Sequence, residues 1–148
     1  MKNVLVDSCF WFAYLSTRCE ELTPKAKEIY EYIEKMQCNI IIPYPSLYET
    51  VNTKLLKDKN KNTANWFLMK LTADPKFKKV FDDKYRENAL AATSANHKRK
   101  ISLVDNIIRL MMEDKTLHID ALITFNSSDF EDVCRNVGIE LINENTVF

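Results

Sequence analysis

Glycine and proline are scarce in this chain, which has one Gly and four Pro among 148 residues. All-β proteins with many tight turns and disordered linkers both depend on these residue types, so the composition excludes both classes. Apolar residues make up 46% of the chain, which is enough to build a sizeable core. The length is that of one ordinary domain, and we predict a single domain over residues 1–148.

An excess of charge is also lacking, because 21 Lys and Arg balance 21 Asp and Glu. The net charge therefore provides no global attraction to nucleic acid or membrane, and only local patches can carry such a preference. No apolar run approaches membrane length, and Lys2 is followed almost at once by Asp7, which argues against a signal peptide. We expect a soluble, cytoplasmic protein that does not contact a membrane.

Paired cysteine motifs are missing as well. The four cysteines are widely spaced and form no C-x-x-C pattern, which argues against a disulfide framework and against a zinc site. We predict that they are buried thiols in a reducing cytoplasm. They are Cys9, Cys19, Cys38 and Cys134.

The opening stretch VLVDSCFWFAYL contains the first candidate for chemistry. A short apolar run, residues 4–6, ends on Asp7 and is followed by Ser8 and a helix-length apolar segment, a pattern typical of a buried parallel strand that leads into a helix. Asp7 then lies at the carboxyl end of a strand, the edge where open α/β sheets bind ligands. The alternative is that Asp7 only caps the helix that follows.

Strand-like and helix-like segments alternate along the rest of the chain. Further strands are predicted at 39–43, 121–124 and 139–142, and residues 76–81 are predicted as an extended link. Helices are predicted over 24–36, from 45 into a lysine-rich end at 57–61, and over 62–74, 82–96 and 101–112, with a short one ending before Gly138. This alternation predicts an α/β fold in three layers, α/β/α, around a central parallel sheet of four to five strands.

Carboxylates gather near the predicted strand ends and helix starts. Ser46-x-x-Glu49 and Ser102-x-x-Asp105 match the capping-box pattern, and either acid alone is more typical of a cap than of a ligand. Helix starts and strand carboxyl ends share one edge of a parallel sheet, so several of these acids should meet. The acids in question are Asp7, Glu49, Asp105, Asp120 and Asp129.

Such a cluster would repel itself unless a cation lay among the carboxylates. Ligand sets made only of oxygen atoms select Mg²⁺ or Mn²⁺ rather than zinc. These ions activate water for attack on phosphodiesters. Neither His97 nor His118 lies in a pattern that suggests a ligand, and we expect both at the surface.

Four segments in this order resemble the PIN-domain nucleases over nearly the whole chain. They are VLVDSCFWFAYL, PSLYET, ISLVDNIIRLMME and DALITFNSSDF. The resemblance implies a PIN-like fold with Asp7, Glu49 and Asp105 as metal-binding acids, and Ser8 and Thr124 as hydroxyls that line the same pocket. Many members have an aspartate two residues after the threonine, where this chain has Asn126.

The fourth position therefore has two candidates. The Asn126 oxygen can hold a metal-bound water, or Asp129 can substitute as a catalytic acid from the next turn. With Asp7, Glu49, Asp105 and Asn126 as the metal set, the resemblance implies an Mg²⁺- or Mn²⁺-dependent endoribonuclease. Asp120 is expected to support the strand or the edge of the pocket rather than to bind metal directly.

The basic run Lys98, Arg99 and Lys100 leads into the predicted Asp105 helix and is a candidate for holding an RNA backbone. Lys54, Lys57, Lys59 and Lys61 could extend that track, and a solvated helix end is the alternative for each. A second group of candidates consists of aromatic residues that could stack bases, although their helical spacing favours a core or a partner interface. These are Trp11, Phe12, Trp66 and Phe67.

Small single-domain members of the PIN family often resemble the toxin of a toxin–antitoxin pair of the VapC type. For this chain, that resemblance implies a short antitoxin as partner. It also implies that the protein forms a homodimer. The competing hypothesis is a PIN-like module that binds RNA or protein without cleaving, which Asn126 at the fourth position keeps open. A haloacid-dehalogenase-type phosphatase is disfavoured because Cys9 stands where that family has its second aspartate.

Overall fold

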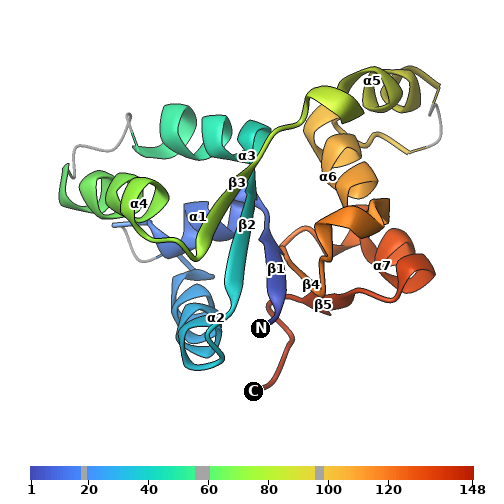
Figure 1. Ribbon diagram of the computed structural model, residues 1–148. Coiled ribbons are helices and arrows are strands. Elements are labelled where there is room, and N and C mark those ends of the chain that lie inside the picture. Colours follow the sequence, from blue (N-terminus) through green and yellow to red (C-terminus); the bar gives the residue numbers. More distant parts are fainter. Residues whose placement is uncertain (18–19, 56–60, 96–98) are drawn as a thin grey trace.

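The computed structural model describes residues 1–17, 20–55, 61–95 and 99–148 (Figure 1). Its strands are β1 (Asn3–Val6), β2 (Asn39–Pro43), β3 (Phe77–Val80), β4 (Ala121–Ile123) and β5 (Glu140–Ile142). Within the described residues these five strands form one sheet in the order β3-β2-β1-β4-β5, and every neighbouring pair is parallel. The predicted α/β class is confirmed. The sheet has five strands, where four to five were predicted.

Helices cover both faces of the sheet. They are α1 (Ser8–Tyr14), α2 (Thr23–Lys35), α3 (Tyr44–Tyr48), α4 (Lys61–Ala73), α5 (Arg86–Ala95), α6 (Leu103–Glu113) and α7 (Glu131–Val137). Short helical segments complete the described chain: the π-helix η1 (Glu49–Leu55) and the 3₁₀ turns η2 (Asp83–Tyr85), η3 (Lys115–Leu117) and η4 (Ser127–Asp129). Figure 1 shows α1, α2 and α4 on one side of the sheet and α6 and α7 on the other, which gives the predicted three layers.

Side chains of each strand alternate between two separate hydrophobic cores, as the pleat of a strand requires. Val4, Val6, Ile40 and Ile42 lie in the core beneath α1, α2 and α4. Leu5 and its neighbours Ile41 and Leu122 point the other way, toward α6 and α7. Because strands β1, β2 and β4 are buried on both faces, they read as unbroken apolar runs and were predictable from the sequence.

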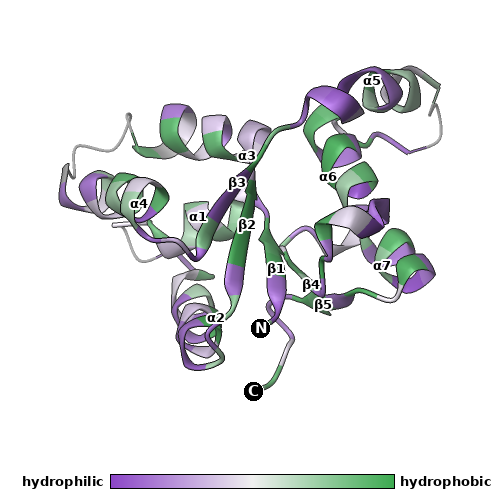
Figure 2. Cartoon of the chain, in the orientation of Figure 1, coloured by the Kyte–Doolittle hydropathy of each residue, from purple (hydrophilic) through white to green (hydrophobic). Residues whose placement is uncertain are grey.

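The segment expected to be an extended link, residues 76–81, is instead the edge strand β3, with Phe77 opposite Ile40. Phe77 is buried, whereas Lys78 and Lys79 are exposed. Figure 2 shows the resulting contrast between the hydrophilic middle of β3 and the hydrophobic β2 beside it. An edge strand is half open to solvent and commonly carries lysines that block further pairing, so its sequence lacks the apolar signature of an inner strand.

The helix predicted from residue 45 is divided into α3 and the π-helix η1, and the junction falls at Glu49. The predicted capping box at Ser46 is wrong: the side chain of Ser46 is buried, makes no hydrogen bond, and does not cap α3. By contrast, the Ser102 hydroxyl accepts a hydrogen bond from the Asp105 amide at 3.1 Å, as the second capping box predicted.

Gly138 ends α7 in the left-handed conformation, with φ of 73°, as expected for a helix C-terminus. Cys38 and Cys134 are buried free thiols and Cys9 is half-buried, while Cys19 lies outside the described residues. None of the helices in the described part of the chain is long and apolar enough to cross a membrane.

Candidate active site

The strand order places Asp7 and Thr124 at the point where the direction of the sheet reverses. The chain runs outward from β1 through β2 to β3, then returns to add β4 and β5 on the opposite side of β1. In open parallel sheets this reversal opens a crevice at the carboxyl edge, between the loops that leave in opposite directions. Asp7 follows β1 and Thr124 follows β4, so both residues lie at that crevice.

Asp7 is nearly buried, at 4% exposure, and every contact that it makes is to a neutral donor. Its Oδ1 accepts from the Ser8 amide at 2.7 Å, and its Oδ2 accepts from the Thr124 hydroxyl at 2.9 Å. The two interpretations of Asp7 are therefore compatible: one oxygen caps α1 while the other faces Thr124 across the crevice.

Cys9 adds a third donor to Asp7, with its Sγ 3.2 Å from Oδ2. Burial and the adjacent Asp7 charge raise the pKa of this thiol to about 12. Cys9 is therefore a protonated donor at neutral pH, and a nucleophilic role for it is disfavoured.

Glu49 is held beside Asp7 by Ser8. The Ser8 hydroxyl donates to Glu49 Oε2 at 2.6 Å and lies 3.5 Å from Asp7 Oδ1. Glu49 is the first residue of η1, where the chain changes from α- to π-helical turns. Departures of this kind are common at functional sites, because they reorient one side chain within a helix.

Asp105 lies in the first turn of α6 and faces other acids. Its pKa is raised to about 7, first by burial, then by the negative charge of Asp7, and then by a hydrogen bond with the carboxyl group of Asp129. Asp7 and Asp129, which come from two other segments, therefore lie close enough to Asp105 to raise its pKa. The structure thus brings these three of the candidate acids toward one another.

Asn126 and Asp129 are linked directly. The Asn126 side-chain amide donates to Asp129 Oδ2 at 2.7 Å, and its backbone amide donates to the Thr124 hydroxyl at 3.0 Å. In this arrangement the Asn126 nitrogen orients Asp129, and the fourth carboxylate beside Asp105 comes from Asp129. Of the two candidates for the fourth position, the geometry favours Asp129 as the acid and Asn126 as its support.

Arg109 is a supporting residue that the sequence analysis missed. It lies one turn after Asp105 on α6, donates to the Asp129 carbonyl oxygen at 2.7 Å, and forms two hydrogen bonds of 2.7 Å with the Asp132 carboxylate. These contacts tie α6 to the segment that carries Asp129. The spacing of four residues from Asp105 was visible in the sequence, but the partner across the fold was not.

The predicted basic run is described only from Arg99 onward, because Lys98 lies outside the described residues. Arg99 donates to the Ser128 carbonyl oxygen and lies 3.3 Å from Asp132, which places it at the rim of the acids. Lys100 is exposed. The four lysines that could extend this basic run are not described either. Lys57 and Lys59 lie outside the described residues, as do the side chains of Lys54 and Lys61.

The aromatic residues considered for base stacking are mostly core. Trp11 and Phe67 are fully buried with ring centroids 4.9 Å apart, and Trp66 and Phe12 are half-buried. Packing, rather than stacking with a ligand, accounts for Trp11 and Phe67.

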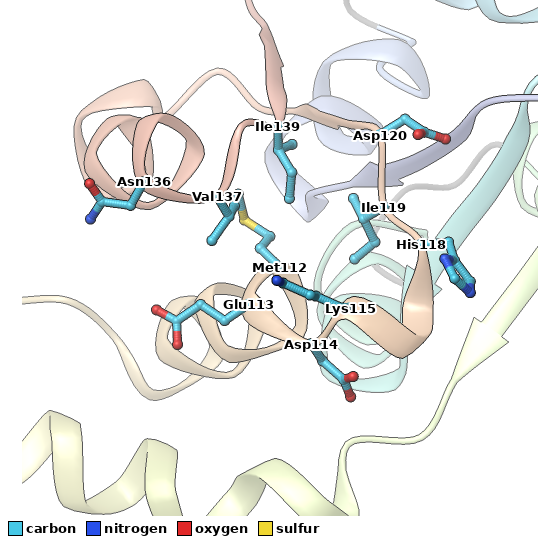
Figure 3. A pocket seen from close by; sticks show the side chains of 10 residues that line it. All are labelled: Met112, Glu113, Asp114, Lys115, His118, Ile119, Asp120, Asn136, Val137 and Ile139. Carbon is cyan, nitrogen blue, oxygen red and sulfur yellow. The ribbon is translucent and has the colours of Figure 1, made fainter.

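Asp120 does not join the other acids, in agreement with the expectation that it supports the strand rather than binding metal directly. It precedes β4, and its Oδ2 accepts from the Asn3 amide at the start of β1, at 2.8 Å. Figure 3 shows it beside a pocket of about 460 Å³ at the amino edge of the sheet, lined also by Met112, His118 and Ile139. Asp120 supports the strand, and His118 is exposed as expected, while His97 lies outside the described residues.

The donor atoms fit a hard divalent cation in type. Asp7, Glu49, Asp105 and Asp129 offer carboxylate oxygens, and Ser8 and Thr124 add hydroxyls. Among the described residues, however, no three His, Cys, Asp or Glu side chains lie close enough together to hold a metal ion. Mutual repulsion keeps ionised carboxylates apart, so a cation would have to draw them together.

No protein-family model matches the chain, and no curated protein matches it either. The resemblance to PIN-domain nucleases therefore stays a prediction from the four sequence segments quoted above.

Proposed function

We propose that this protein is a metal-dependent endoribonuclease whose site lies at the crevice between β1 and β4. One observation carries the proposal: acids from separate segments converge on Asp105 and raise its pKa to about 7, and no cationic side chain is among the causes. A cluster of acids at the ligand-binding edge of a parallel sheet suits a divalent cation and a phosphodiester.

The roles follow from the geometry. Asp7, Glu49 and Asp105 would hold Mg²⁺ or Mn²⁺, with Ser8 fixing the Glu49 carboxylate and Thr124 fixing that of Asp7. When bound, the ion supplies charge neutralisation at the phosphodiester and an acidified water. Asp129 contributes the further carboxylate beside Asp105, and Asn126 supports it through a bond of 2.7 Å. Arg99, which donates to the Ser128 carbonyl oxygen next to Asp129, and the exposed Lys100 would hold the RNA backbone.

The experiment that tests this proposal is cleavage of a mixed structured RNA with Mg²⁺, with Mn²⁺ and with EDTA, using wild type, Asp7→Asn and Asp105→Asn. Asp120→Asn is the matched control, because it removes the same charge at the opposite edge of the sheet. We expect cleavage by wild type and Asp120→Asn only, and none in EDTA. Equal cleavage by all four proteins would identify a contaminant and defeat the proposal.

We further propose that the cleaving protein is the VapC-like toxin of a toxin–antitoxin pair and acts as a homodimer. The support is the resemblance alone, joined to the small size of the chain. Expression of the wild type in a bacterial host should arrest growth, and expression of Asp7→Asn should not. Normal growth with an active nuclease would favour an RNA-processing enzyme instead.

A non-cleaving scaffold is the second candidate, and two observations favour it. Asn126 stands at the position where the PIN family has its fourth acid. In addition, no three acidic, His or Cys side chains of the described residues lie close enough together to bind a metal ion. RNA binding without cleavage under every metal condition would support this alternative.

A further inference from the structure

Three aromatic rings gather at the carboxyl edge of the sheet, outside both hydrophobic cores. Tyr44 and Phe81 are stacked, with ring centroids 4.8 Å apart and planes 15° from parallel, and Tyr48 adjoins Tyr44 at 6.0 Å. Phe81 is 70% exposed and Tyr48 is 57% exposed. Large aromatic side chains are rarely left this open without a ligand or partner, because burying them stabilises the fold.

These rings lie at the same edge of the sheet as the acids. Tyr44 and Phe81 directly follow Pro43 and Val80, which are paired at the ends of β2 and β3, and Tyr48 directly precedes Glu49. Neighbouring strands are about 4.8 Å apart, so the end of β3 lies about 10 Å from the end of β1. That separation corresponds to about three stacked nucleotides of one strand, at about 3.4 Å each. Figure 1 shows α3 and the end of β3 together at the top of the sheet.

An ordered arginine adjoins the rings. Asp82 is buried and receives two hydrogen bonds from Arg86, at 2.9 and 3.1 Å. These bonds, and to a lesser degree the nearby Tyr48, raise the pKa of Arg86. The rest of its guanidinium remains open, since the side chain of Arg86 is 62% exposed. A guanidinium fixed in this way beside aromatic rings can stack on a base or contact a phosphate.

We choose a nucleic acid as the occupant because the rings lie at the same edge of the sheet as the proposed site. Exposed charged side chains border the rings, among them Lys79, Asp83 and Arg86. A pocket that includes Arg86 is also lined by the exposed apolar residues Leu90 and Leu103. Aromatic residues beside Arg occur in protein interfaces as well as in platforms for single-stranded nucleic acid, so a protein partner is an outcome that the test separates.

We propose that Tyr44, Tyr48 and Phe81 form a stacking platform for unpaired bases of the RNA that is bound at the acids. This inference rests on the proposed function and extends it: the substrate is single-stranded where it meets this edge, and the platform holds nucleotides that neighbour the scissile phosphodiester. Bases of any identity have a π-face, so the platform selects strandedness rather than sequence.

The test measures binding in EDTA, where no metal-dependent cleavage occurs. Single-stranded oligoribonucleotides that contain 2-aminopurine are titrated with protein, and an abasic oligonucleotide of the same length and charge is titrated in parallel. Stacking quenches 2-aminopurine fluorescence. We expect the wild type to quench it and to bind the base-bearing strand more tightly than the abasic one.

Phe81→Leu and Tyr48→Leu keep apolar area and remove the rings. Each should weaken binding of the base-bearing strand by about tenfold, reduce quenching, and leave abasic binding unchanged. Phe81→Trp should restore both signals. The matched control is Phe148→Leu, because Phe148 is also an exposed ring, 46% exposed and stacked on Tyr32 at 4.3 Å, but it lies at the C-terminus. It should bind like the wild type.

Equal affinity of the wild type for base-bearing and abasic strands would overturn the proposal, as would unchanged binding by Phe81→Leu. Light scattering supplies an independent outcome: dissociation of an oligomer by Phe81→Leu would identify the rings as a protein interface and also overturn it. Cleavage is measured separately. Base stacking without cleavage would support the stacking platform and contradict the nuclease proposal. Cleavage without base stacking would support the nuclease proposal and contradict the stacking platform.

Discussion

The hydroxyl of Ser8 donates to Glu49 across 2.6 Å, although 41 residues separate the two in the sequence. This bond joins the start of α1 to the start of η1 and sets Glu49 beside Asp7. A polar group that orients a metal ligand commonly governs metal affinity as strongly as the ligand does.

Ser8→Ala should therefore weaken Mn²⁺ binding and cleavage by about 10- to 100-fold, because Glu49 loses the donor that positions it. The cost to the free energy of unfolding should be only about 1 kcal/mol, the usual net contribution of one hydrogen bond. Calorimetric titration with Mn²⁺ and thermal unfolding measure the two effects. Thr72→Ala on α4 is the control, since Thr72 is exposed and its hydroxyl donates to carbonyl oxygens of its own helix. Equal metal affinity of wild type and Ser8→Ala would refute this prediction.

Asp105 makes stability depend on pH in the absence of metal. Its pKa is about 7 in the folded protein against an ordinary 3.8, so the folded state binds the proton more tightly than the unfolded state. The free energy of unfolding should therefore fall as pH rises from about 4 to about 7, by about 2 kcal/mol after allowance for partial exposure.

Asp105→Asn should remove this dependence and be more stable than wild type at pH 8 in EDTA. Urea unfolding at several pH values measures it. Mn²⁺ should stabilise the wild type and not the variant, because bound metal favours the folded state. A variant less stable than wild type at pH 8 would contradict the electrostatic account.

Arg109 holds the Asp129 segment against α6. Arg109→Ala leaves the Asp132 carboxylate without its bidentate partner, so unfolding should become easier by about 2 kcal/mol and cleavage should fall. Arg109→Lys should recover part of the stability and little of the cleavage, since an ammonium cannot contact the Asp129 carbonyl and both Asp132 oxygens in the same geometry. Lys84→Ala breaks a more exposed ion pair with Asp114 and is the control; it should leave cleavage unchanged.

Arg109 also lowers the pKa of Asp132 below its usual range, through the hydrogen bonds first and then through its charge. The stability contributed by this pair is present above the ordinary pKa of aspartate and is lost as pH falls below it. The free energy of unfolding of the wild type should consequently fall more steeply below about pH 4 than that of Asp132→Asn when both curves are normalised to neutral pH, because the variant has no carboxylate to protonate at this position.

Asn126→Asp supplies the acid that the family resemblance expects. The change replaces a donor to Asp129 with a second negative charge, so the variant should be less stable than wild type in EDTA and should gain more stability from Mn²⁺. Asn145→Asp adds the same charge on an exposed turn near the C-terminus and should change neither value. Identical Mn²⁺ responses in all three proteins would show that position 126 does not face the metal.

Much of the fold was predictable because the inner strands and the inward faces of the helices have strong apolar patterns, as in β1, β2 and α6. Edge strand β3 was missed, since half of it faces solvent. The convergence of Asp7, Asp105 and Asp129 followed from the rule that strand ends and helix starts share an edge. Asp120 lies at the other end of its strand and supports β1, as expected.

Contacts between distant segments could not be predicted in the same way. The Arg109 pair with Asp132 and the Tyr44 stack with Phe81 depend on how helices and loops pack, and neither residue type nor local spacing encodes that packing. The failed cap at Ser46 has a local cause: its helix begins two residues earlier, at Tyr44, so the serine falls inside the helix.

The bond between Thr124 and Asp7 closes a loop of 117 residues, because β4 inserts beside the first strand of the chain rather than beside the strand made before it. Chains are synthesised from the N-terminus, and contacts this distant in sequence form late. While the ribosome is still making β3 and α5, the nascent chain has Asp7 and Glu49 but lacks Asp105, Thr124 and Asp129. The nuclease that we propose would therefore remain inert throughout most of its own translation, and the messenger RNA that encodes it would not be cleaved by the unfinished product.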